Sequence, residues 1–192
     1  MLKVNKIKEP KFFMNFKRKV NIKNWKQMND FPKEKRNLRD ILLIEEQNYY
    51  CPYCEIKLEI DSEMSIEHIQ PKDLFPNLLL EYNNLIVSCK TSTTCDQYKK
   101  NNWDEKFIDP VKEDPENYLE YNLFSGEIQP KNYTGLEYER AKYTIDILNL
   151  NSTKLVQSRK KLVLELYYCG KDYLDSYDSN FPNLIKKLKL SL

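Results

Sequence analysis

The sequence lacks the features that mark membrane, secreted and repetitive proteins. No apolar run approaches the ~20 residues of a membrane-spanning helix. The first residues, MLKVNKIKEPKF, contain no apolar stretch of the kind found in a secretory signal. Internal repeats and low-complexity tracts are missing as well. We therefore expect a cytoplasmic protein without a membrane partner.

Histidine is almost absent, and neither sign of charge dominates the chain. The sequence has 1 histidine, and its 31 Lys and Arg against 29 Asp and Glu give a net charge of +2, which alone says nothing about nucleic acid. Residues 1–40, however, hold 13 basic against 4 acidic side chains (+9), which leaves 18 against 25 (−7) for the remainder. This basic segment could contact phosphates or could be a solvated, partly mobile terminus. Its aromatic residues could stack on bases, but we expect them to pack onto the domain: Phe12, Phe13, Phe16 and Trp25.

Cysteine occurs in an odd number, which argues against a disulfide framework. The 5 cysteines fit reduced, metal-binding thiols better. One of them, Cys169, ends an apolar helix face and is expected to be a buried thiol rather than a ligand. The length of 192 residues predicts one domain, or a small core with a helical annex. A hydrophobic content of 41% suffices for a true core despite a mean hydropathy of −0.73.

The other four cysteines form two pairs. Cys51 and Cys54 stand in CPYC, and Cys89 and Cys95 follow at a distance of some 35 residues. Two cysteines separated by two residues present both sulfurs to one ion from a tight turn, and a second pair completes the tetrahedral thiolate set that zinc prefers. The second pair is more widely spaced than usual, but the sole histidine and an adjacent acid lie between the pairs. We predict a zinc ion that is structural, because a closed four-sulfur site has no open position for water.

The motifs around these cysteines carry a resemblance to a known family. CPYC, EHIQPK, NNL, SC and CDQYK follow one another as in the HNH (ββα-metal) endonucleases with a four-cysteine zinc knuckle, the McrA-like group. More narrowly, residues 34–165 resemble the PtuB-type HNH nucleases of Septu and retron-associated anti-phage systems. The chain departs from the broader HNH pattern at Asp96, where His or Asn is usual. An aspartate is still a competent ligand for a hard cation.

Phosphodiester cleavage needs an activated water and a cation that neutralises charge at the phosphorus. His68 is the candidate general base because imidazole titrates near neutral pH, although a lone histidine is more often structural. Glu67 and Asp96 are candidate ligands for one Mg²⁺ or Mn²⁺ ion, and the alternative for each is a surface acid or helix cap. Asn84 matches the middle residue of the HNH pattern and would hold the loop or the imidazole. Asn83 could take that place, and a turn-forming Asn is the alternative.

Three lysines near these motifs are candidate contacts to DNA phosphates: Lys72, Lys99 and Lys100. A solvated lysine is the ordinary interpretation of each. The resemblance also implies an ATPase partner of the PtuA type, which we expect to dock largely through residues 103–192.

The predicted fold is α+β, with a ββα-metal (HNH) core stapled by the four-cysteine zinc site and surrounded by helices. We expect a basic, irregular arm over residues 1–32, the nuclease core over 33–102, and an irregular linker with a helical region over 103–192. In the core, a helix over about 33–48 should precede a ribbon of two strands, 55–60 and 64–69, and a helix that starts at residue 95.

Two further helices are expected, one from Leu136 onward and one over 152–169. Ser152 is the predicted N-cap of the second, Gly170 should end it, and its apolar residues should share one face, Tyr167 among them.

The function predicted from all this is a metal-dependent HNH endonuclease that hydrolyses DNA, the effector of a bacterial anti-phage system. One alternative is a zinc-knuckle module that binds nucleic acid or docks a partner without cleaving. Another is a decayed nuclease kept as an interaction protein. Neither explains an intact Glu67, His68 and Asp96.

Overall fold

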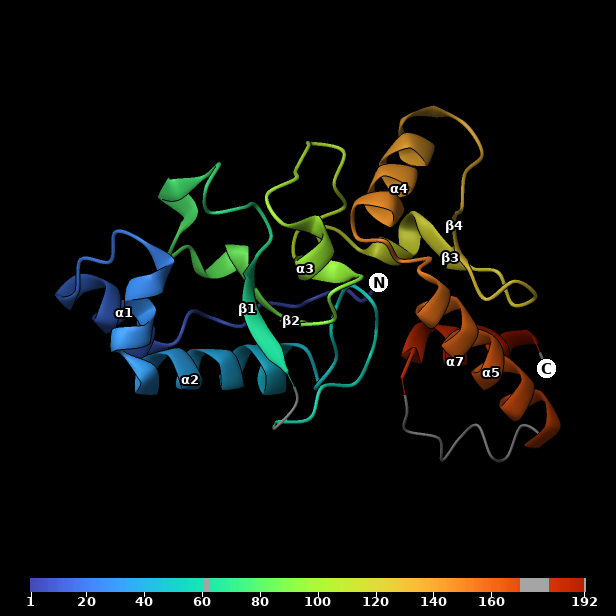
Figure 1. The fold of residues 1–192 in the computed structure, drawn as a ribbon, viewed down its shortest axis with the longest axis horizontal. Coiled ribbons are helices and arrows are strands. Elements are labelled where there is room, and N and C mark those ends of the chain that lie inside the picture. Colours follow the sequence, from blue (N-terminus) through green and yellow to red (C-terminus); the bar gives the residue numbers. More distant parts are fainter. Residues whose placement is uncertain (61–62, 170–179, 192) are drawn as a thin grey trace.

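A computed structural model describes residues 1–60, 63–169 and 180–191 of the chain. Figure 1 shows a small central hairpin, β1–β2, with helix α3 beside it; helices α1 and α2 lie on one side of this unit and the remaining helices and a second hairpin on the other. None of the helices in these described ranges combines the length and hydrophobicity needed to cross a lipid bilayer.

The central unit has the ββα order expected of an HNH core. Strands β1 (Met64–His68) and β2 (Leu85–Cys89) pair antiparallel, and α3 (Cys95–Lys99) follows. Every residue of β2 is buried, so the run LIVSC is a core strand covered on both faces. The loop between the strands contains two short 3₁₀ helices, Pro76–Leu78 and Tyr82–Asn84.

The strand predicted over residues 55–60 is wrong, because the partner of β1 is β2. Around this segment the structure has a single β-bridge, between Tyr50 and Lys57. Glu55 has a φ of 64°, which breaks an extended run, and its buried carboxylate pairs with the ammonium of Met1 at 2.7 Å. Two further bonds come from far along the chain: the backbone N–H of Phe181 donates to the carbonyl of Glu55, and that of Asn183 donates to its carboxylate. The alternation in EIKLEI therefore reflects a loop held by distant groups.

The N-terminal region is folded, which corrects the expected irregular stretch from Pro10 to Pro32. It contains helix α1 (Lys11–Lys19) and a 3₁₀ helix (Trp25–Asp30), which Asn24 caps together with Gln27. Phe13 and Phe16 are buried, so the prediction that aromatic residues pack this region onto the domain is confirmed for these two.

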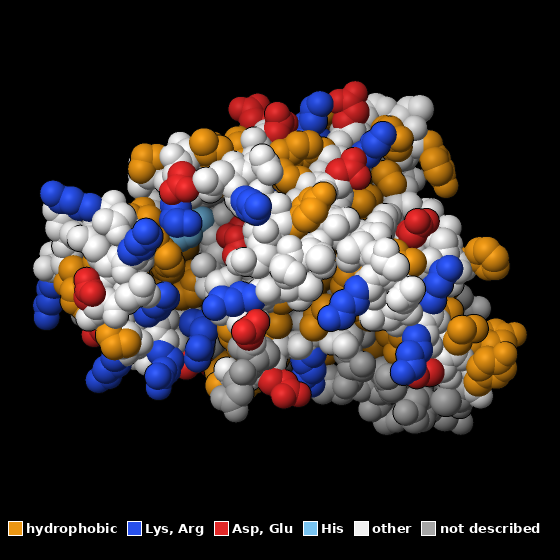
Figure 2. All heavy atoms as spheres, viewed as in Figure 1, with side chains coloured by type: hydrophobic (Ala, Val, Ile, Leu, Met, Phe, Trp, Pro, Cys, Tyr) orange, Lys and Arg blue, Asp and Glu red, His pale blue; other side chains and the backbone are white. Residues whose placement is uncertain are grey.

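The helix expected over residues 33–48 is present in two pieces. Helix α2 (Pro32–Ile41) begins with Pro32. Proline has no backbone N–H, but in the first turn of a helix this N–H would have no acceptor within the helix, so none of its hydrogen bonds is lost. A π-helical turn (Leu42–Glu46) continues the helix. Leu38 and Leu42 point into the core. The opposite side of this region is cationic: Figure 2 shows Lys and Arg side chains gathered over α1 and α2.

The C-terminal part contains more regular structure than the sequence predicts. The stretch from Trp103 to Tyr133, expected to be irregular, holds a 3₁₀ helix and a second hairpin. The elements from here on are Pro115–Asn117, β3 (Leu119–Tyr121), β4 (Ile128–Pro130), α4 (Gly135–Ile147), α5 (Thr153–Cys169) and α7 (Pro182–Ser191).

Helices α4 and α5 confirm the two predicted helices, with differences in detail. The Oγ of Ser152 has no hydrogen-bond partner, so its side chain does not cap α5. Tyr167 is 66% exposed and does not share the buried face of Leu155, Leu162 and Leu166. Gly170 and the side chain of Cys169 lie outside the described residues.

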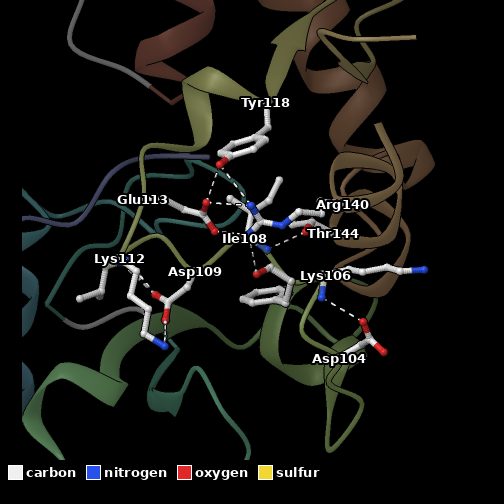
Figure 3. A network of polar contacts seen from close by, with 11 residues as sticks. Asp104, Lys106, Ile108, Asp109, Lys112, Glu113, Tyr118, Arg140 and Thr144 are labelled. Atoms are coloured by element: carbon white, nitrogen blue, oxygen red, sulfur yellow. Dashed lines mark hydrogen bonds and ion pairs between the residues drawn. The ribbon is translucent and has the colours of Figure 1, made fainter. Parts of the chain in front are cut away.

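A polar network joins the segment after the nuclease core to helix α4 (Figure 3). The guanidinium of Arg140 forms a forked ion pair with Glu113 and also donates to the hydroxyl of Tyr118, which itself donates to Glu113. Nearby, the backbone N–H of Ile108 donates to the Oγ1 of Thr144 at 3.0 Å. These bonds fix the segment against α4 within the C-terminal part.

Candidate active site

The four paired cysteines converge on one point. Cys51, Cys54, Cys89 and Cys95 are buried, and their sulfurs all lie within 4.8 Å of one another. The Sγ atoms of Cys51 and Cys95 are 3.9 Å apart, and those of Cys54 and Cys89 are 3.8 Å apart. These separations are far from the ~2.05 Å of a disulfide.

The sulfur positions fit a single tetrahedral metal ion. Four sulfurs at ~2.3 Å from a central ion would be about 3.8 Å from one another, which the two measured separations match. Hydrogen bonds from the other three thiols lower the pKa of the Cys89 thiol. The four-cysteine cluster can therefore hold a metal such as zinc.

Local hydrogen bonds place these cysteines. At the first cysteine pair, the N–H of Glu55 donates to the carbonyl of Cys51, and the N–H of Cys51 donates to the carbonyl of Ile56. At the second cysteine pair, the N–H of Cys95 donates to the carbonyl of Leu148, the residue that caps the end of α4. The cysteine cluster thus ties the nuclease core to the C-terminal part.

Glu67, Asp96 and Lys99 form a second cluster, between β1 and α3. Glu67 is 6% exposed, and its Oε1 lies 2.8 Å from the Nζ of Lys99, which is completely buried. Burial raises the pKa of Glu67 well above its usual value; Lys99 opposes this shift, and the nearby Asp96 adds to it. Asp96 is half-buried in the first turn of α3 and accepts a hydrogen bond from Ser65 at 3.1 Å. Two neighbouring carboxylates with like charge are a fitting pair of ligands for a hard divalent cation.

His68 lies at the end of β1, and its ring is close enough to Asp96 and Lys99 for their charges to affect its pKa. The ring packs edge-on against Trp25, with centroids 4.6 Å apart at 88°. Its Nε2 is 3.0 Å from the carbonyl of Leu79. Because a carbonyl can only accept, Nε2 carries the proton, and Nδ1 of the neutral ring is the basic nitrogen. Burial lowers the pKa of His68 to about 4, so the ring is neutral at pH 7.

Asn84 connects the two ends of the loop that crosses the site. Its side chain accepts from the N–H of Gln70 at 2.8 Å and donates to the carbonyls of Gln70 and Leu78. Asn83, the alternative, is exposed, and its side chain takes no part in these bonds. The structure thus gives Asn84 the contacts of a loop-holding residue.

The three candidate lysines fall in different environments. Lys99 is fully buried and paired with Glu67, so its ammonium is engaged inside the protein and not exposed for a phosphate. Lys72 is half-buried, and its charge contributes to the low pKa of His68, which places it near the ring. Lys100 is exposed at the end of α3.

Two residues of the site were not predicted in the roles they have. Lys99 neutralises Glu67 and donates, at 3.4 Å, to the carbonyl of His68. Trp25 reaches the His68 ring from a region 43 residues earlier in the chain. The spacing CDQYK places Lys99 on the side of α3 that carries Asp96, and no local pattern signals the contact of Trp25.

The chain is similar in sequence to known nucleases. A family described as HNH endonuclease matches residues 51–101. The chain is 35% identical over 147 residues to a protein of Vibrio cholerae serotype O1 biovar El Tor named as the HNH endonuclease of retron Vc95, covering 72% of this chain and 69% of that protein. It is 36% identical over 115 residues to the Septu protein PtuB of Bacillus thuringiensis, covering 58% of this chain and 40% of PtuB. A protein of Escherichia coli named as the HNH endonuclease of retron Ec83 is 26% identical over 215 residues, covering 90% and 83%.

Proposed function

This chain belongs to the HNH endonuclease family, and on that premise we propose that it is a metal-dependent nuclease that cuts DNA in bacterial anti-phage defence. The observation that carries the proposal is the contact between β1 and α3 inside a ββα unit, where Lys99 lies 2.8 Å from Glu67 and Ser65 donates to Asp96, so both carboxylates lie beside His68. The role in defence is supported by similarity to proteins named for retrons and for Septu.

The chemistry proposed for this site is hydrolysis with His68 as general base. Nδ1 of His68 takes a proton from a water molecule, the water oxygen attacks the phosphorus, and the bond to the 3′ oxygen breaks. The departing 3′ oxygen takes a proton from solvent water, which leaves a 3′ hydroxyl and a 5′ phosphate. The carbonyl of Leu79 keeps the ring in the required tautomer, and Asn84 holds the loop that carries Leu79. Burial keeps the imidazole neutral and therefore ready to accept a proton.

Glu67 and Asp96 would hold a Mg²⁺ or Mn²⁺ ion, which when bound neutralises charge at the phosphoryl group. Magnesium usually keeps several waters and needs only one or two carboxylates, so this pair suffices. Zinc is the ion we propose for the four cysteines, with a structural role because all four positions around it are taken by sulfur.

A plasmid-cleavage assay tests the catalytic proposal. Wild-type protein should nick supercoiled DNA with Mg²⁺ and not without it. Asp96→Ala should lose most of this activity, whereas Asp96→Asn should keep more of it, because an amide oxygen still coordinates a hard cation. Equal activity of Asp96→Ala and wild type would remove Asp96 from the metal site.

We also propose that the protein acts in the cytoplasm with an ATPase partner of the PtuA type, held largely through residues 103–192. The resemblance to PtuB supports the partner, and exposed apolar side chains on α5 support the surface: Leu164 (57%), Tyr167 (66%) and Tyr168 (82%). A weakly specific nuclease that was always active would damage the cell's own DNA, so control by a partner has a physical reason.

Co-purification with the co-encoded ATPase tests this second proposal. A truncation after Asn102 is unsuitable, because residues 110 and 183 hydrogen-bond to the N-terminal segment. The double variant Leu164→Lys/Tyr167→Lys in the full chain should lose the partner, and Leu136→Lys, equally exposed on α4, should keep it. Retention by both would move the docking surface away from α5, and failure of the wild type to co-purify would remove the partner.

A further inference from the structure

A groove with a cationic lining lies beside the candidate active site. It has a volume of about 380 Å³ and is bordered by the 3₁₀ helix that starts at Trp25, by α2 and by β1. We call it the basic groove, after the four cations in its lining: Lys35, Arg36, Arg39 and Lys90. No Asp or Glu is among the described residues that line it.

The cations of α2 share one face of that helix. Lys35 and Arg36 lie four and three residues before Arg39, the spacing at which side chains on a helix surface are neighbours. Leu38 of α2 and Leu42, just after it, are fully buried and lie on the adjoining side, toward the core. Helix α2 therefore turns an apolar face to the core and a cationic face to the groove, which agrees with the Lys and Arg side chains over α2 in Figure 2.

These charges are only partly compensated within the protein. Arg39 pairs with Asp40 at 2.6 Å, and Lys35 donates to the side chain of Asn29 at 2.8 Å. Arg36 and Lys90 are exposed, and neither makes an ion pair in the described part of the chain. Burial, together with the charge of Lys90, lowers the pKa of Lys35. Cations from α2 and from the end of β2 thus face one another across the groove.

The groove and the candidate site share strand β1 and Trp25. The floor of the groove includes Ser65 and Ile66 of β1, and the same strand continues to Glu67 and His68. At ~3.3 Å per residue, Ser65 lies about 10 Å from His68 along the strand. Successive phosphates of one DNA strand are farther apart than the ~3.4 Å rise along the helix axis, because the strand winds around that axis, so this distance corresponds to fewer than three nucleotides. Trp25 belongs to both places, because it lines the groove and touches the His68 ring.

We infer that the basic groove holds phosphates of the substrate DNA strand within three nucleotides of the bond that is cut. The inference rests on the proposed nuclease site and adds the path of the substrate to it. Contacts of this kind fix the position of DNA without reading its sequence, because the phosphate backbone is the same at every step. The groove would then present any sequence to His68.

The test is equilibrium binding of a fluorescein-labelled 20-base-pair duplex, measured by anisotropy between about 50 and 200 mM NaCl. All proteins are full chains carrying His68→Ala, so that the DNA is not cut. Arg36→Ala/Lys90→Ala removes the two exposed, unpaired cations. The matched control is Lys33→Ala, an exposed lysine on α2 that does not line the groove.

Each lost phosphate contact lowers the salt dependence of log Kobs by about 0.9, so the double variant should flatten the slope by about 1.8 and weaken binding roughly tenfold. The Lys33→Ala control should change the slope by less than half of the amount expected for one lost phosphate contact. An unchanged slope for the double variant would overturn the inference. An equal loss of affinity with Lys33→Ala would also overturn it, because DNA would then respond to the net positive charge of the protein and not to the groove. Tighter binding of an RNA duplex of the same sequence would overturn DNA as the ligand.

A cleavage assay separates this inference from the proposed function. With His68 intact, Arg36→Ala/Lys90→Ala should lower kcat/KM roughly tenfold and leave kcat at saturating DNA near the wild-type value, because the groove binds the strand away from the reacting bond. A wild-type chain that binds DNA with the predicted slope but never cuts it would sink the proposed function and leave the groove standing.

Discussion

The two ends of the hairpin β1–β2 both bury ionisable groups, and they stabilise them differently. At one end Cys89 stands opposite Met64, and at the other His68 stands opposite Leu85. At the cysteine end the four thiols hydrogen-bond with one another and with hydroxyl groups. At the other end Glu67 has a cation of the protein itself, Lys99, at 2.8 Å. A metal ion at the cysteine end would complete the fold, whereas a metal ion at the carboxylate end would serve the chemistry.

Removing one thiol should break the cysteine end and have the largest effect. Purified protein should contain about one tightly bound zinc, and Cys54→Ser should lose the metal and most of its folded structure, because binding energy at a structural zinc site is folding energy. Metal analysis and circular dichroism measure both. The control is Cys169→Ser, outside the cluster, which should keep the metal. A wild type that is fully folded without metal would contradict this account of the cysteine end.

At the other end, His68→Ala should abolish chemistry and spare the fold. Loss of a general base lowers the rate of cleavage by about 10²–10⁴-fold, whereas the ring contributes one hydrogen bond and one edge-on contact to the structure. Plasmid cleavage, zinc content and thermal unfolding of the same preparation separate the two effects. Cleavage at the wild-type rate would move the general base to another residue.

Replacing Lys99 by methionine should make the stability of the carboxylate end depend on a bound metal ion, as we expect for the cysteine end. Glu67 would stay buried without its cation, which costs about 3 kcal/mol in the free energy of unfolding measured in urea. Mg²⁺ should then restore part of the stability of Lys99→Met and have little effect on the wild type. Glu67→Gln/Lys99→Met, which removes both charges, should be more stable than the single variant. Equal stability of Lys99→Met and wild type would show that Lys99 does not balance Glu67.

The smallest effect is expected at the loop between the strands. Asn84→Ala removes bonds to both backbone groups of Gln70 and should cost about 1–3 kcal/mol of stability, with slower cleavage because the loop also carries the carbonyl that orients His68. The neighbouring exposed Asn83→Ala is the control and should change neither. If Asn83→Ala slows cleavage as much as Asn84→Ala, the assignment of Asn84 is wrong.

What the sequence predicts well is what local spacing determines. The cysteine pairs, the strand at Met64–His68 and Asp96 in the first turn of α3 all follow from motifs a few residues long, and the structure has each of them. Asn84 was preferred to Asn83 on the same ground, and its side chain has the loop-holding contacts.

The errors lie where distant groups decide the local structure. The alternation in residues 55–60 is typical of a strand, but Glu55 is drawn into a turn by Met1 and Asn183. Lysine is ordinarily a surface residue. Lys99 is buried against Glu67 only because β1 packs next to α3. Short segments with few apolar residues, such as β3, gain their stability from pairing and cannot be told from loops by pattern.

The hydrogen bonds from Phe181 and Asn183 to Glu55 have a consequence for the order in which the protein is made. Asn183 follows Glu55 by 128 residues, and at a synthesis rate of about 5–20 residues per second it is added roughly 6–26 s later. Until then the turn after the first cysteine pair lacks the donor to its carbonyl and one of the two partners of its carboxylate, and only the ammonium of Met1 is in place. Growing chains on the ribosome therefore carry an unfinished cysteine turn, and the nuclease is completed only after α7 has emerged and docked.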